Sequence, residues 1–171
     1  VDVITLKSGG IFNNTGGALI GNAYNVESGF IQKNLGGSAA LTKTTAGIVE
    51  LFTPCSYTGP TNINAGTLRI MNHDLLPDTA SVTVSSGATL SLNGFNNDTI
   101  GALTGSGTVQ VPGTSTWTVG GGNASSTFSG VISGPGSLAK TGTGNFTLSG
   151  ANTYTGVTTV NAGTFSLGAS G

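Results

Sequence analysis

Residues 43–70 read KTTAGIVELFTPCSYTGPTNINAGTLRI and contain two apolar pairs, Val49/Leu51 and Leu68/Ile70. The members of each pair lie two residues apart, a period that is typical of a β-strand with one buried face. The pairs begin nineteen residues apart. This interval is too short for a strand, a crossover helix and a second strand, which need about thirty residues. It accommodates three short strands and three turns, and the segment therefore predicts one coil of a parallel β-helix.

The same interval recurs along the whole chain, with successive gaps of 18, 19, 19, 22, 19, 19, 18 and 19 residues. A repeat of this length predicts a solenoid, because one coil cannot bury its apolar face alone and must stack on its neighbours. We therefore expect one all-β domain over residues 1–171, a β-solenoid of about nine coils with three short strands per coil. The residues expected to stack in one inward row are Phe12, Phe30, Val49, Leu68, Leu90, Val109, Phe128, Phe146 and Phe165.

A second inward row is predicted eight to ten residues before the first in each coil. Helices are not predicted, because β-branched residues and glycine interrupt every stretch in which a 3.6-residue period could develop. The longest gap contains MNHDLLPD, residues 71–78, and we expect this loop to protrude. The second row consists of Ile20, Leu41, Pro60, Val82, Ile100, Val119, Leu138 and Val157, of which the proline fits worst because it cannot donate a hydrogen bond to a sheet.

Charged residues make up only 6% of the chain, and the formal net charge is -1. Such a chain lacks the positive field that drives binding to nucleic acid or to anionic membranes, and both partners are therefore unexpected. No apolar run is long enough for a membrane helix, and the first residues do not form a targeting signal. The chain is rich in glycine, but its apolar residues keep their register from end to end, which favours folding over disorder.

An internal duplication is visible when the chain is shifted by 97 residues. Residues 43–70 then align without a gap on residues 140–167, KTGTGNFTLSGANTYTGVTTVNAGTFSL. The two copies share Lys43 with Lys140, a Tyr-Thr-Gly turn and an Asn-Ala-Gly-Thr run. Both copies are therefore expected to fold alike.

Residues 134–168, GPGSLAKTGTGNFTLSGANTYTGVTTVNAGTFSLG, resemble the passenger-associated transport repeat of bacterial autotransporters. The resemblance is carried by the lysine-threonine-glycine opening, the SGANTYTG turn and the NAGT strand start. Residues 79–111 are similar to the stretch that commonly follows this repeat in such passengers. The resemblance covers residues 43–168, whereas residues 1–40 fit only by their coil spacing.

The resemblance implies a right-handed β-helix that is secreted across the outer membrane of a Gram-negative cell through a C-terminal barrel. It also implies a secreted or cell-surface location and a role as an adhesin or in a surface fibre. In the first copy, FTPCSYTG replaces SGANTYTG, and this puts Cys55 where passengers seldom carry cysteine. A lone cysteine cannot form an internal disulfide, which leaves an inert small residue or an intermolecular crosslink as alternatives.

The acidic residues are scattered over distant coils, and we expect no catalytic, cofactor-binding or metal-binding residues. His73, Asp74 and Asp78 share the protruding loop and could bind a metal or share a proton, but such residues more often shape turns. The remaining acids are Asp2, Glu27, Glu50 and Asp98. The only arginine, Arg69, lies between inward Leu68 and Ile70 and should point outward in a solvated or hydrogen-bonding role.

Tyr57 and Tyr154 occupy matching turns and are the best candidates for surface contacts, although stabilisation of their own turns is the simpler interpretation. The aromatic row is interpreted as core rather than as a ligand-stacking strip, because its spacing follows the coil. The chain begins in strand-like VDVITL and finishes with FSLGASG, and neither end has an amphipathic cap. We therefore expect the rod to continue or to add end to end to another copy.

These observations predict a non-enzymatic extracellular structural or adhesive module. It would form the stalk of an autotransporter-like passenger or a subunit of a surface fibre that extends by end-to-end stacking. The alternative is a carbohydrate-active or other enzyme-bearing β-helix, which would need several carboxylates gathered in one groove. No cofactor is expected, and the sequence does not identify a ligand.

Overall fold

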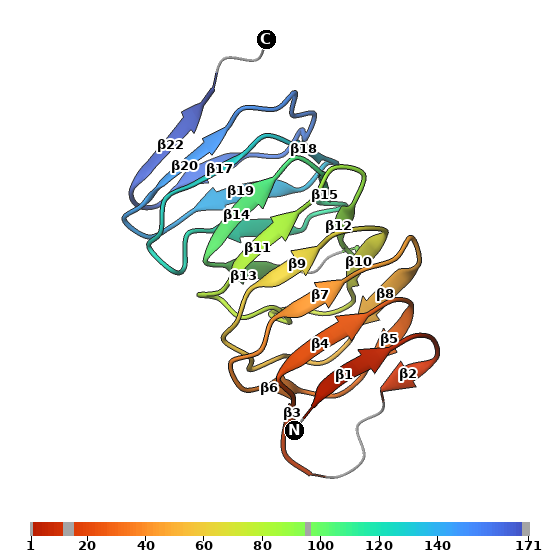
Figure 1. The fold of residues 1–171 in the computed structure, drawn as a ribbon. Coiled ribbons are helices and arrows are strands. Elements are labelled where there is room, and N and C mark those ends of the chain that lie inside the picture. The colour runs from red at the N-terminus through yellow and green to blue at the C-terminus, as the bar shows by residue number, and fades with distance from the viewer. Residues whose placement is uncertain (1, 12–15, 95–96, 169–171) are drawn as a thin grey trace.

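The computed structural model describes residues 2–11, 16–94 and 97–168, and these residues form strands and turns but no helix. The strands pair in parallel and stack as a right-handed β-helix of about eight turns, drawn as a rod in Figure 1. None of these residues lies in a helix that could cross a membrane. The predicted all-β parallel β-helix is thus confirmed.

The longest side of the rod is a nine-stranded sheet that reaches from one end to the other (Figure 1). Along its strands buried and outward residues alternate, because successive side chains of a strand point to opposite faces. Its strands are β1 (Val3–Leu6), β4 (Ala23–Val26), β7 (Leu41–Lys43), β9 (Thr61–Ile63), β11 (Ser81–Val84), β14 (Ala102–Gly105), β17 (Ser126–Phe128), β20 (Asn145–Leu148) and β22 (Thr164–Leu167).

The second side is a seven-stranded sheet. Its middle strands carry the pairs from which the fold was predicted, with Leu68 of one strand in register with Val49 before it and Leu90 after it. Its strands are β2 (Gly10–Ile11), β5 (Gly29–Ile31), β8 (Ile48–Leu51), β10 (Thr67–Ile70), β12 (Thr89–Leu92), β15 (Thr108–Gln110) and β18 (Val131–Ser133).

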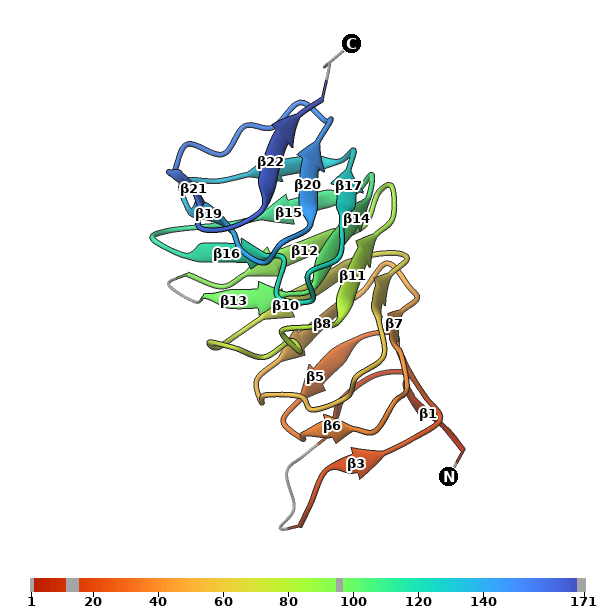
Figure 2. The ribbon, with the colours of Figure 1, turned by 90° about the vertical axis from the view of Figure 1, so that its left-hand side faces the viewer.

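The third side is interrupted, so the prediction of three strands in every coil is only partly right. A two-stranded sheet lies near the N-terminal end and a four-stranded sheet covers the other half of the rod (Figure 2). Between them, residues 52–60 and 71–80 pass along this side without forming strands, and residues 149–157 pass along the second side in the same way. The strands are β3 (Leu19–Ile20) and β6 (Leu35–Gly36), then β13 (Asp98–Ile100), β16 (Thr116–Val119), β19 (Ser137–Lys140) and β21 (Thr158–Val160).

The first predicted row runs over two sides of the rod rather than one. Val49, Leu68, Leu90 and Val109 stack as predicted, but the next residue in register is Ile132. The coil from Val109 to Ile132 takes 23 residues. Counting nineteen residues from Val109 therefore reaches Phe128, which lies on the neighbouring sheet. Phe128, Phe146 and Phe165 accordingly lie in the nine-stranded sheet, where Phe146 pairs with Phe165.

Phe30 is also misplaced by the nineteen-residue count. Gly29 is the partner of Val49, whereas Phe30 pairs with outward Glu50. Its ring lies over Gly10 of the adjacent strand, where a Cβ would come within 2.3 Å of the ring. Phe30 therefore covers a glycine on the outer face and is not part of the core row. Phe12 lies outside the described residues.

The second predicted row changes sides as well. Leu41 and Val82 belong to the nine-stranded sheet, while Ile100 and Val119 pair in the four-stranded sheet. The partner of Leu138 is Trp117. The row is wrong elsewhere too, because Ile20, Pro60 and Val157 are exposed.

The two copies of the duplication form the same local structure on different sides of the rod. In the first copy, β8 and β10 lie in the seven-stranded sheet and β9 lies in the nine-stranded sheet. In the second copy, the equivalent β20 and β22 lie in the nine-stranded sheet and β21 lies on the third side. The repeat thus specifies a corner between two consecutive sides, and the second corner is displaced by one side around the axis.

Candidate functional site

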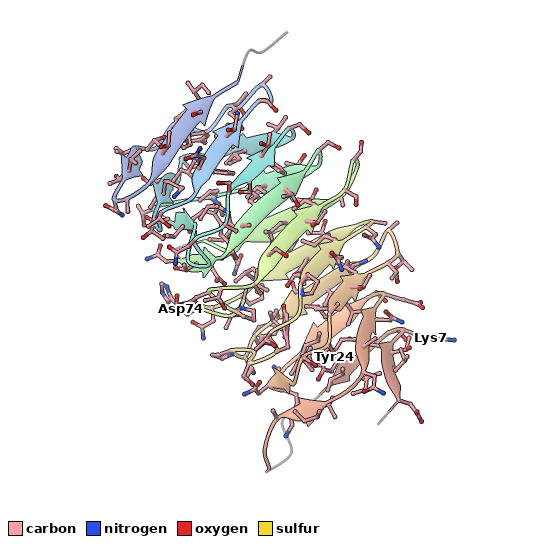
Figure 3. The ribbon with its side chains drawn as sticks, turned by 60° about the vertical axis from the view of Figure 1, so that its left-hand side comes forward. Lys7, Tyr24 and Asp74 are labelled. Carbon is pink, nitrogen blue, oxygen red and sulfur yellow. The ribbon has the colours of Figure 1, made fainter. Side chains whose placement is uncertain are left out.

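The protruding loop of residues 71–80 binds to the backbone of the next coil. The His73 Nδ1 atom accepts a hydrogen bond from the Asn97 N–H at 3.0 Å, and the Asp74 N–H donates to the Asn97 carbonyl at 3.0 Å. Asp74 has a φ of 49°, which suits a turn, and lies at the periphery of the rod (Figure 3). Among the described residues, no three His, Cys, Asp or Glu side chains gather in a group that could hold a metal ion. His73 and Asp74 therefore hold the loop in place, while Asp78 is exposed in it.

Asp98 is the acidic residue that the sequence analysis undervalued. It is only 1% exposed, and its Oδ2 atom accepts hydrogen bonds from the N–H groups of Leu75 and Leu76 at 3.0 and 3.2 Å. Its Oδ1 atom has no hydrogen-bond partner within the described residues, and neither has Nε1 of Trp117, its cross-strand neighbour. The signal was present in the sequence, since Asp98 stands two residues before inward Ile100. The side chain fastens the loop to the four-stranded sheet.

Burial raises the pKa of Asp98 to about 7, and the nearby Asp74 carboxylate adds to the rise. The hydrogen bonds from Leu75, Leu76 and Thr99 act in the opposite direction but do not offset burial. The folded chain therefore holds a proton on this carboxyl group at pH values at which the unfolded chain has released it.

The first prediction concerns the pH dependence of stability. The folded-state pKa of Asp98 lies above the unfolded value of 3.8, so the folded chain binds more protons and the contribution of Asp98 to stability grows as pH falls from about 7 towards 3.8. Asp98→Asn should remove this dependence. At pH 8 it should raise the free energy of unfolding by about 1–2 kcal/mol, since the uncompensated charge disappears while the amide NH2 group that replaces Oδ1 stays without an acceptor. Urea titrations from pH 4 to 8 measure both effects.

Two controls separate Asp98 from its neighbours. Trp117 is the only tryptophan, so its emission reports locally on the pair that it forms with Asp98. A pH titration of this emission should persist in His73→Asn and vanish in Asp98→Asn. The opposite pattern would assign the transition to the histidine and contradict the assignment to Asp98.

The lysine that opens each repeat is buried. Lys43 is 0% and Lys140 is 1% exposed, and burial lowers the pKa of both. The Lys140 ammonium donates to the carbonyls of Thr141, of Gly142 at 2.9 Å and of Ala162 at 3.3 Å, while the Lys43 ammonium donates to the Thr45 carbonyl. The lysines thus bind backbone carbonyls at the corners of the rod, a role that the sequence analysis missed although both copies carry the residue.

Our second prediction tests this corner interaction. Lys140→Met keeps most of the side-chain volume but leaves carbonyls at the corner without their donor. The free energy of unfolding should fall by about 1–3 kcal/mol, the usual cost of a buried polar group that loses its partner. Lys7→Met is the matched control, because Lys7 is exposed and extends from the rod (Figure 3). Equal losses in both variants would contradict the role of the buried ammonium.

Asparagine side chains reinforce the stacking of coils at other turns. Four of them accept a hydrogen bond through Oδ1 from a backbone N–H about one coil away. The pairs are Asn34 with Ser56 at 3.0 Å, Asn97 with Thr116 at 2.7 Å, Asn123 with Thr143 at 3.0 Å and Asn152 with Ile132 at 2.9 Å. Asparagine in the turns therefore contributes to the spacing between coils rather than to a binding site.

The tyrosines of the matching turns have structural partners. The Tyr57 hydroxyl lies 2.6 Å from Thr61 Oγ1, and the Tyr154 hydroxyl lies 2.6 Å from Thr158 Oγ1. The interpretation as turn-stabilising residues is confirmed, and Tyr57 is wrong as a surface candidate because it is fully buried. Cys55 is partly buried, and burial raises its pKa to about 11, which favours an inert thiol.

Arg69 points outward from the seven-stranded sheet, as predicted. Its Nη1 atom lies 2.9 Å from Oε1 of Glu50 on the adjacent strand. Both side chains are about one-third exposed, so the ion pair contributes little to stability. Asp98, the two buried lysines and this ion pair thus hold loops, corners and strands together.

Comparison with known proteins agrees with this architecture. Residues 41–70 and 138–167 each match the family Passenger-associated-transport-repeat. No curated protein and no solved structure matches the chain. The chain therefore carries two passenger-associated transport repeats on a β-solenoid, consistent with the repeat domain of an autotransporter passenger.

Proposed function

We propose that the chain is a rigid, non-enzymatic stalk module of an autotransporter-like passenger, located at the cell surface or secreted. The observation that carries the proposal is the nine-stranded parallel sheet, which runs unbroken along the rod with one continuous core behind it. A solenoid of this kind resists bending because every coil is hydrogen-bonded to the coils on either side. Its mechanical role is to hold other parts of a passenger at a fixed distance.

The outer face of this sheet supports a role in broad, weak contact. The central outward residue of every strand carries a hydroxyl or amide group and no charge. These residues recur at the spacing of the strands, about 4.8 Å. They are Thr5, Asn25, Thr42, Asn62, Thr83, Thr104, Thr127, Thr147 and Ser166. Such a face suits adhesion to uncharged polar surfaces or packing beside other fibres.

The distribution of acidic groups supports a scaffold rather than an enzyme. Asp74 and Asp98 are near each other, but the Asp98 carboxylate accepts hydrogen bonds from the N–H groups of Leu75 and Leu76. The Glu50 carboxylate forms an ion pair with Arg69. General acid–base chemistry needs carboxyl groups that converge on a space for substrate. Within the described part of the chain, the carboxylates of Asp98 and Glu50 make structural contacts instead.

End-to-end stacking completes the proposed stalk. The strands at either end of the rod have one unpaired edge, and parallel edges of this kind bind further strands. Val3 at one end and Leu167 at the other expose apolar side chains beside these edges. Further turns of β-helix, from the same passenger or another copy, are the proposed partners.

A change in the number of coils tests the stalk function. Deletion of residues 24–40 removes one coil, because Tyr24 and Leu41 are partners in register, and it retains both matched repeats. With the chain displayed behind a C-terminal barrel on a Gram-negative cell, this deletion should bring an N-terminal fluorophore about 5 Å closer to the membrane. Duplication of the same segment should move it outward by the same step. A fluorophore distance that does not follow the number of coils would contradict the proposal.

A further inference from the structure

The duplication allows the last described turn to be compared with a buried copy of itself. In the first copy, Ile63 and Ile70 are 0% exposed. Their counterparts in the second copy, Val160 and Leu167, are 50% and 74% exposed. The same sequence module therefore presents apolar side chains that are covered in one location and uncovered in the other.

The first copy also shows what covers such a surface. Val84 of β11 pairs with Ile63, and Leu92 of β12 pairs with Ile70. The loop of residues 71–80 joins β10 to β11 and lies over the turn that precedes β9. There the Leu75 carbonyl accepts a hydrogen bond from the Cys55 N–H at 3.0 Å. One turn of β-helix, residues 71–92, thus supplies the whole cover.

The second copy has a hollow where this cover would lie. The hollow has a volume of about 280 Å³, and β22 lies along the free edge of the nine-stranded sheet (Figures 1 and 2). Leu148 and Leu167 line it. Leu148 is 1% exposed, like its counterpart Leu51, whereas Leu167 is 74% exposed and its counterpart Ile70 is fully buried. The N–H of Asn152, the counterpart of Cys55, bonds only locally to the Gly150 carbonyl at 3.0 Å.

We propose that the surface formed by residues 148–152 and by β21 and β22 binds one further turn of β-helix of the kind that residues 71–92 form, joined to β22 as β11 and β12 are joined to β10. This inference rests on the proposed stalk function and specifies the chemistry of its next turn. The occupant has two four-residue strands with apolar inward residues, preceded by a loop that places a buried leucine over the Tyr154 turn.

The opposite end of another copy fits this description poorly. On the third side, the strand of another copy that would meet β21 is β3, which has only two residues, whereas β11, which covers β9 in the first copy, has four. On the first side, β1 would meet β22 and has four residues, as β12 has, so the misfit of another copy lies on the third side. A turn like residues 71–92 is therefore the occupant that the duplication supports.

A fusion tests the proposal directly. A second copy of residues 71–111 replaces residues 168–171, so that it follows directly after Leu167, the counterpart of Ile70. Amide hydrogen exchange in β21 and β22 should slow by about tenfold or more, because a covered strand opens less often than an edge strand. The matched control has the appended copies of Leu90 and Leu92 changed to Asn, and its exchange should stay as fast as in the parent chain.

Two outcomes would overturn the proposal. The first is unchanged exchange in β21 and β22 both in this fusion and in a longer one that appends residues 71–140. The longer fusion is included because fraying of its added end would still leave the turn next to β22 covered. The second is concentration-dependent association of the unextended chain that Leu167→Asn abolishes, because this would assign the surface to another copy. Neither outcome affects the relation between coil number and length, so failure of this proposal is distinguishable from failure of the stalk function.

Discussion

Gly66→Ala should lower the free energy of unfolding by about 3 kcal/mol or more, measured by urea titration. Gly66 belongs to the Asn-Ala-Gly-Thr run and has a φ of 67°, a conformation that costs energy for any residue with a Cβ. A Cβ there would also lie 2.3 Å from the carbonyl oxygens of both Thr45 and Gly47 in the adjacent coil. Those oxygens belong to the backbone, so the two coils would have to move apart.

Gly87→Ala separates the two causes of this loss. Gly87 has a φ of 78°, but a Cβ there would meet nothing within 4 Å. Its substitution should therefore cost only the backbone strain, about 1 kcal/mol. Similar losses for Gly66 and Gly87 would show that close stacking of the coils at this corner is not the cause. Gly163, the counterpart in the second copy, would approach the carbonyls of Gly142 and Gly144 in the same way.

Phe128→Ala should lower the free energy of unfolding by about 3–5 kcal/mol, the range for truncation of a fully buried aromatic residue. Phe128 is 0% exposed and lies between Gly105 of the preceding strand and Leu148 of the following strand. Gly105 contributes no side chain to this pair, so truncation of Phe128 leaves a cavity that its partner cannot fill. Thermal or urea unfolding followed by circular dichroism measures the loss.

The neighbouring Thr127 provides the control for Phe128. It lies on the same strand, but its side chain points outward and is exposed. Thr127→Ala should change the free energy of unfolding by no more than about 0.5 kcal/mol. A loss for Phe128→Ala as small as this would mean that the core of the nine-stranded sheet is not packed at this coil.

The sequence predicts the architecture well because the coil length is a property of the whole chain. Every coil must return to the same side of the rod, and the pairs at Val49 and Leu68 show both the return and the alternation of a strand. The duplication predicts equally well that Lys43 and Lys140 occupy equivalent corners. The coil period and the duplication therefore predict the fold even where single residues differ between coils.

The side of the rod on which each residue lies is not predictable from the interval alone. From Val26 to Lys43 one coil takes 17 residues, and from Gly105 to Phe128 it takes 23. A row drawn with constant steps therefore moves from one sheet to the next without any change in its spacing. Only the hydrogen-bonded register shows that Phe128 and Val109 belong to different sides.

The structural roles of the buried polar side chains could not be predicted from the sequence either. Asp98 and Lys140 have polar side chains at inward positions, and their partners are backbone groups of other coils. Backbone groups carry no residue-specific signal, so their positions follow only from the folded chain. For this reason the sequence showed only that the acidic residues are scattered over distant coils, and it did not predict the loop-holding role of Asp98.

The claim that coils stack in a straight row is tested most directly by distances between spin labels at positions 5, 83 and 166, with Cys55 replaced by serine. These positions lie on β1, β11 and β22, the first, fifth and ninth strands of the nine-stranded sheet. We predict about 19 Å from 5 to 83, about 19 Å from 83 to 166 and about 38 Å from 5 to 166, from four and eight steps of about 4.8 Å. A distance from 5 to 166 clearly shorter than the sum of the other two would contradict the stacked rod.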